Sequence, residues 1–98
     1  MSGRNHILQE IETERQYQEN KWGNDADDKI NFPNDWVTYI NHHATRWFKG
    51  GFAPYDDKTI DAFRAQMIKV AAIAVAAAES IDRQRAEHGR TIYQKDAA

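Results

Sequence analysis

The run VAAIAVAAA at residues 70–78 constrains the fold more than any other part of this 98-residue sequence. It lies within a longer segment, about residues 59–88, that predicts one continuous helix. Nine apolar residues in succession leave this helix without a polar face, so other helices must cover all of its sides. Two short helices of the same chain can hardly do so. The run therefore predicts a homodimer or higher homo-oligomer, with Ala74 and Ala78 at or near a helix–helix contact.

Two shorter helices are predicted upstream, at about residues 5–22 and 35–48. Gly23 follows the first helix in the position that glycine favours, and Thr59 is a candidate N-cap for the long helix, which ends at Gly89. We predict an all-α fold in which three helices and a loosely held tail, residues 90–98, form a single domain, residues 1–98. Such subunits would assemble into a helical bundle.

The composition limits the classes of protein to be considered. A net charge of −2 does not fit a general nucleic-acid binder, so no direct DNA binding is expected. The absence of cysteine excludes disulfides and thiolate metal sites. No stretch approaches the roughly 20 apolar residues that span a membrane, and the N-terminus has no apolar signal core. We expect a cytoplasmic protein without a membrane partner.

The first helix carries polar residues on its apolar stripe. Arg15 and Gln18 fall where a plain amphipathic helix would place leucine, in line with Ile7, Leu8, Ile11 and Trp22. Two interpretations are open. Either Arg15 reaches solvent from the edge of the helix, or Arg15 and Gln18 face a polar cavity.

The second helix contains the adjacent pair His42 and His43. One side of this helix is apolar and comprises Trp36, Val37, Ile40, Ala44, Trp47 and Phe48. His43 lies near the centre of that side and is interpreted as a core histidine with one hydrogen-bond partner. His42 lies on the polar side and is expected to be exposed. The two histidines point in different directions, so they are poor candidates to bind one metal ion.

The loop after the first helix is acidic, with Asp25, Asp27 and Asp28. It lacks the glycine and the closing glutamate of an EF-hand calcium loop. We therefore interpret it as a solvated acidic loop.

The chain has no phosphate-binding glycine loop, no nucleophile elbow and no zinc spacing. Its inward-pointing polar residues are instead mostly neutral or cationic donors, which suit an anionic ligand, and its aromatic residues could stack on a base. Cations and aromatic rings are what a nucleotide site between the three helices needs, but they also occur in ordinary small cores. No catalytic residue and no metal ligand is assigned among them. The candidate binding residues are Arg15, Gln18, Lys21, Trp22, Asn41, His43, Trp47, Gln66 and Lys69.

Three segments carry a family resemblance: ERQYQENKWG, NDWVTYI and FRAQMIKVAAIAVAAAESIDR. Over roughly residues 10–85 the chain resembles a group of short phage and prophage proteins. That group is similar to the MazG-like all-α nucleoside triphosphate pyrophosphohydrolases, and some relatives are labelled dATP/dGTP diphosphohydrolases. The resemblance implies a helical dimer or tetramer in which the second and third helices flank a nucleotide site.

The chain departs from the family at the metal site. Active members hold Mg²⁺ with E-x-x-E and E-x-x-D patterns, whereas this chain has Asn41, His42 and Thr45 in the first region and Gln66 and Lys69 in the second. We therefore expect a catalytically degenerate binding protein with no cofactor, which sequesters a nucleotide-derived signal, for example a messenger of host defence.

Two other functions stay open. One is a Mg²⁺-dependent pyrophosphohydrolase with ligands from the Asp25–Asp28 loop, Glu14 or Glu79. The other is an inhibitor that binds a host protein and takes no small ligand.

Overall fold

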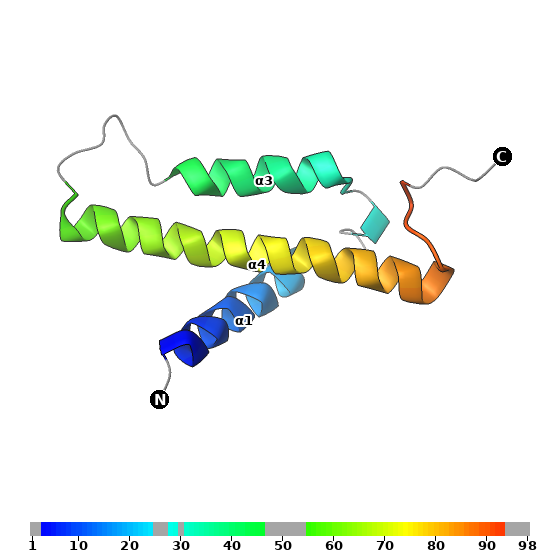
Figure 1. Ribbon diagram of the computed structural model, residues 1–98, viewed down its shortest axis with the longest axis horizontal. Coiled ribbons are helices and arrows are strands. Elements are labelled where there is room, and N and C mark those ends of the chain that lie inside the picture. The colour runs from blue at the N-terminus through cyan, green and yellow to red at the C-terminus, as the bar shows by residue number, and fades with distance from the viewer. Residues whose placement is uncertain (1–2, 25–27, 30, 47–54, 94–98) are drawn as a thin grey trace.

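The computed structural model describes residues 3–24, 28–29, 31–46 and 55–93. These residues form three helices and no strand, which confirms the all-α prediction for the described part of the chain. The helices are α1 (Gly3–Trp22), α3 (Pro33–Arg46) and α4 (Asp57–His88) (Figure 1).

The long helix α4 is the centre of the arrangement. Helix α3 lies alongside it and runs in the opposite direction, whereas α1 crosses it obliquely (Figure 1). Within the described residues, α1 and α3 each pack against α4 but not against each other. One long helix therefore carries two separate helix–helix contacts, and any site must be assigned to one of them.

Local capping explains where α4 begins and ends. The N-cap is Asp56, whose Oδ1 accepts a hydrogen bond from the Thr59 backbone N–H over 2.8 Å. The prediction of Thr59 as the cap was wrong, because the aspartate three residues earlier supplies the acceptor. Gly89 ends the helix in the left-handed conformation, φ 75°, and its N–H donates to the Arg85 carbonyl.

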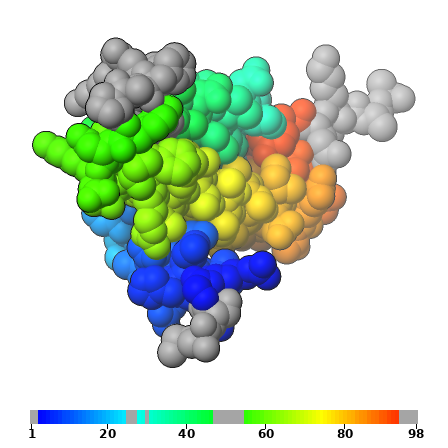
Figure 2. All heavy atoms as spheres, turned by 60° about the vertical axis from the view of Figure 1, so that its left-hand side comes forward, coloured from blue at the N-terminus to red at the C-terminus, as the bar shows by residue number. Residues whose placement is uncertain are grey.

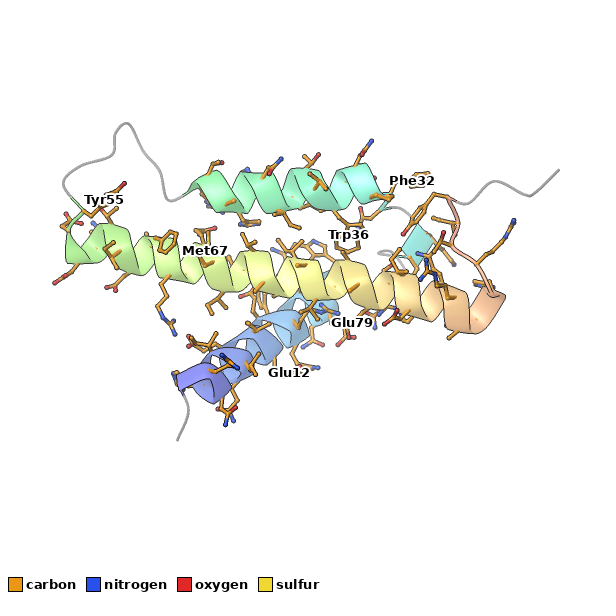
Figure 3. The ribbon with its side chains drawn as sticks, viewed as in Figure 1. Glu12, Phe32, Trp36, Tyr55, Met67 and Glu79 are labelled. Carbon is orange, nitrogen blue, oxygen red and sulfur yellow. The ribbon has the colours of Figure 1, made fainter. Side chains whose placement is uncertain are left out.

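A small apolar core joins α3 to α4. Trp36 lies between the two helices (Figure 3) and packs with Ile73 and Ala76, while Ile40 lies beside them. Val37, which was expected on the inner face, is 55% exposed. It lies about 100° around the helix from Trp36, and α4 covers only the side that carries Trp36. Trp47 and Phe48 lie outside the described residues.

The interior face of α1 is polar. Arg15 and Gln18 are its buried residues, with exposures of 5% and 7%. The interpretation in which Arg15 reaches solvent from a helix edge was therefore wrong. The apolar residues toward the two ends of α1 stay exposed: these are Ile7, Leu8 and Trp22.

A chain of polar contacts binds the inter-helix loop and the tail to α4. Both Ser80 and Arg83 donate to the carboxylate of Asp28, over 2.7 Å for Ser80 Oγ. Gln84, which is 2% exposed, donates to Ser80 and accepts from the backbone N–H of Ile92 over 2.7 Å. Asp28 is therefore a paired structural acid and not the solvated loop acid that was expected. Asp25 and Asp27 lie outside the described residues.

The start of the C-terminal tail is also packed. Thr91 is 3% exposed, and the ring of Tyr93 lies 5.4 Å from that of Phe32. The prediction of a loosely held tail is thus wrong for residues 91–93. Residues 94–98 lie outside the described part.

Two helices do not cover the apolar run of α4. Ala72, Ile73 and Ala76 are buried, but Ala74 and Ala78 are exposed in the single chain. Among the described helices, none has the length and apolar character needed to cross a membrane.

Candidate functional site

A groove of about 900 Å³ lies between α1 and α4. Its walls combine four carboxylates, from Glu10, Glu12, Glu14 and Asp61, with the side chains of His6, Gln9, Thr13, Tyr17, Arg64, Ala65, Ile68 and Lys69. A space of this size can hold a small organic ligand. We take this groove as the candidate site.

The spacing of Glu10, Glu14 and Tyr17 places them on one side of α1, since residues four and seven apart share a helix face. Among the groove's carboxylates, only Glu14 was predicted as a possible ligand from the sequence. The spacing of these residues along one face of α1 is the sequence pattern from which this wall of the groove could have been predicted.

Two of the groove's charged residues neutralise each other. Both terminal nitrogens of the Arg64 guanidinium donate to the carboxylate of Glu10. These hydrogen bonds, more than the neighbouring charges, hold the pKa of Glu10 below its ordinary value. Because the Arg64 guanidinium is paired with Glu10 of α1, it is not available to bind an anionic ligand.

Lys69 is the groove's other permanent cation. It is half-buried, and no carboxylate of the described residues forms an ion pair with it. A partly desolvated ammonium group without a partner attracts an anion more strongly than an exposed one does. Tyr17, 55% exposed, lines the same groove.

An aromatic and cationic cluster continues from the groove along α1. The ammonium of Lys21 lies 4.9 Å from the ring centre of Trp22 and 5.7 Å from that of Tyr17. Trp22 is 57% exposed, so its ring offers a stacking surface. Tyr17 belongs to both the groove and this cluster.

Arg15 and Gln18 face α4 but have structural partners. Arg15 Nε donates to Glu79 Oε1 over 2.8 Å, and Figure 3 shows Glu79 on the side of α4 where α1 passes. Gln18 donates to Glu14 within α1. Arg15 therefore serves the packing of α1 against α4 in this arrangement.

The remaining candidates lie on the α3 side of α4. Nδ1 of His43 is 3.0 Å from Oε1 of Gln66, an acceptor, so this contact favours the tautomer with a proton on Nδ1. His43 is half-buried and His42 exposed, as expected from the pattern. Asn41, expected to point inward, is exposed, because it lies on the side of α3 that α4 does not cover. Trp47 lies outside the described residues.

The predicted site residues are thus divided between two contacts. Arg15, Gln18 and Lys69 lie on the α1 side of α4, whereas His43 and Gln66 lie on the α3 side. Since α1 and α3 do not pack together in the described part, the structure does not bring these two groups into one cavity.

The described residues contain no cluster of carboxylates of the kind that holds Mg²⁺. Within residues 3–24, 28–29, 31–46 and 55–93, no three of the His, Asp and Glu side chains are placed to hold a metal ion together. Of the acids considered as ligands, Glu79 binds Arg15 and Asp28 binds Arg83, while Glu14 lies in the groove.

Comparison with protein-family models, with curated proteins and with solved structures finds no match for this chain. The resemblance to MazG-like proteins stays a prediction that rests on the quoted motifs.

Proposed function

We propose that this protein binds a nucleotide or nucleotide-derived anion in the groove between α1 and α4 and does not hydrolyse it. The observation that carries the proposal is that Lys69 and Tyr17 line the same groove. Lys69 would contact a phosphate, and Tyr17 or the neighbouring Trp22 would stack on the base.

The carboxylates of the groove favour a ligand of low charge. Glu10 is neutralised by Arg64, but Glu12, Glu14 and Asp61 remain around Lys69, which has no ion pair among the described residues. A triphosphate would be repelled by these acids, because like charges at short range disfavour each other. A ligand with one or two phosphate charges, bound at Lys69, fits this distribution better.

The biological use that we propose is sequestration, in the cytoplasm, of a nucleotide signal used in host defence. This part of the proposal is supported only by the resemblance to phage proteins.

A thermal-shift screen tests the proposal. The panel contains nucleoside monophosphates, cyclic nucleotides, diphosphates and triphosphates, each without added metal. At a concentration 100 times Kd, a ligand adds about 2.7 kcal/mol to stability. We expect the largest shift from a ligand with one or two phosphate charges. A folded protein whose melting temperature is unchanged by every member of the panel would contradict nucleotide binding.

A further inference from the structure

Helix α4 carries an exposed apolar stripe on the side away from α1 and α3. Ile60, Met67, Ala74 and Ile81 recur at every seventh residue, and Val70 and Ala78 lie between them. Ile60 is 47% exposed, Ala74 and Ala78 are exposed, and the other three are half-buried. In Figure 2, the surface of α4 lies uncovered between α1 below and α3 above.

The seven-residue spacing indicates what kind of surface could cover the stripe. Apolar residues that recur on a heptad keep one seam of a helix facing a partner helix along its whole length. From Ile60 to Ile81 this seam extends about 32 Å at 1.5 Å per residue. The small side chains of Ala74 and Ala78 allow a second helix to approach closely near the middle.

The charges at the two ends of α4 favour a reversed copy of the same helix as the partner. The N-terminal end carries Asp56 and Asp57, and the last turns carry Arg85 and His88. An antiparallel copy of α4 would place its arginine beside these aspartates at both ends of the contact. A parallel copy would place like charges together. The helix is therefore complementary to itself when the copy is reversed, as a two-fold symmetric interface requires.

We propose that α4 pairs with α4 of a second copy, antiparallel, along this stripe. The midpoint between Ile60 and Ile81 places the two-fold axis near Val70 and Ala71, so that Met67 of one copy meets Ala74 of the other. Lys69 lies five residues before Ala74, about 140° around the helix at 100° per residue. The ligand groove stays open in this dimer, and the proposal does not depend on the proposed function.

Sedimentation of matched alanine variants tests the surface. Ala74 lies on the stripe, whereas Ala86 is also exposed on α4 but points away from the stripe. We therefore expect glutamate at either position to leave the single subunit intact. We expect wild type and Ala86→Glu to sediment at twice the 11.3 kDa chain mass, and Ala74→Glu to sediment as a monomer with unchanged helix content by circular dichroism. A monomeric wild type at micromolar concentration would overturn the proposal and leave the stripe to a different partner. Equal dissociation of both variants would overturn the assigned surface.

Cysteine cross-linking tests the direction, since the chain has no cysteine of its own. Val70→Cys lies beside the axis and should form a disulfide-linked dimer on oxidation. Two copies of Ala78→Cys would be about 22 Å apart along the helices, beyond the roughly 7 Å Cα separation that a disulfide tolerates. We therefore expect Ala78→Cys to stay unlinked. Efficient linking of both variants would indicate parallel helices, and linking of neither would place the interface elsewhere; each result overturns the antiparallel pairing.

Discussion

Arg15 of α1 is 5% exposed and donates from Nε to Oε1 of Glu79 on α4 over 2.8 Å. The Glu79 side chain is 48% exposed, so the cation is buried and the anion faces solvent. A second carboxylate, Glu19, lies 3.9 Å from Nη2, and the buried Nη1 has no hydrogen bond within the described residues. This ion pair joins α1 to α4 at a position where an apolar contact would be the ordinary solution.

Glu79→Ala should lower the free energy of unfolding by about 1–2 kcal/mol, because it leaves a buried guanidinium without its closest acceptor. Because Glu79 is partly exposed, we expect a smaller loss of stability than for breaking a fully buried ion pair. Glu79→Gln should cost less, since the amide oxygen can still accept. Arg15→Met is the informative control: it removes the same ion pair but leaves no buried unpaired charge, since Glu79 faces solvent, and it should also cost less than Glu79→Ala. Urea denaturation measures all three, and equal stability of wild type and Glu79→Ala would contradict this role.

The contact of Asp28 with Arg83 and Ser80 should make stability depend on pH in the acid range. Burial raises the pKa of Asp28, but the hydrogen bonds from Arg83 and Ser80 outweigh it, and the pKa lies below the ordinary value of 3.8. Because the folded-state pKa is lowered, the stabilisation is complete above the unfolded-state pKa and is lost as pH falls through the folded-state pKa. We expect Asp28→Asn to be less stable than wild type at pH 7, with a difference that shrinks below pH 3.8. Urea denaturation at pH 7 and in this acid range measures the stability of both proteins. If their difference in stability were the same at both pH values, this role of Asp28 would be contradicted.

Gln84→Met should destabilise the start of the tail. Methionine fills a similar volume but leaves the Ile92 N–H without its acceptor, and an unsatisfied group of this kind costs about 1–3 kcal/mol. Hydrogen exchange of the Ile92 amide should become faster than in wild type, while amides in the middle of α1 keep their protection. Unchanged exchange at Ile92 would mean that the contact does not hold the tail in solution.

Lys69→Ala should weaken binding of the best nucleotide from the thermal-shift screen by tenfold or more, since a charge-assisted hydrogen bond contributes about 1.5–3 kcal/mol. Lys58→Ala removes an exposed lysine of the same helix outside the groove and should leave Kd unchanged. His42→Ala should also have little effect. Titration calorimetry measures Kd for each variant. Equal Kd values for wild type and Lys69→Ala would contradict a ligand site in this groove.

If the resemblance to MazG-like proteins holds, hydrolysis should be absent or very slow, because Asn41, Thr45, Gln66 and Lys69 would then stand in the regions where the active enzymes carry carboxylates. The assay measures pyrophosphate release from the common dNTPs with Mg²⁺ or Mn²⁺. Turnover near 1 s⁻¹, the low end of typical enzyme rates, would show that a catalytic site exists and that the binding-only proposal is wrong.

The sequence by itself determined the features that depend on near neighbours. The three helices follow from apolar spacing, and the stop of α4 follows from a glycine that can adopt the left-handed conformation, φ 75° at Gly89. The contrast between half-buried His43 and exposed His42 was also predictable, because adjacent residues on a helix point about 100° apart.

Only the tertiary structure decided which faces meet. The partners of Arg15 and Asp28 lie 64 and 55 residues away along the chain, so no local pattern could assign Glu79 to one or Arg83 to the other. The acidic groove has the same origin, because the oblique crossing of α1 brings Glu10 and Glu14 beside Asp61 and Lys69. A helical pattern reports the direction in which a side chain points, whereas its partner depends on the angle and register at which two helices pack.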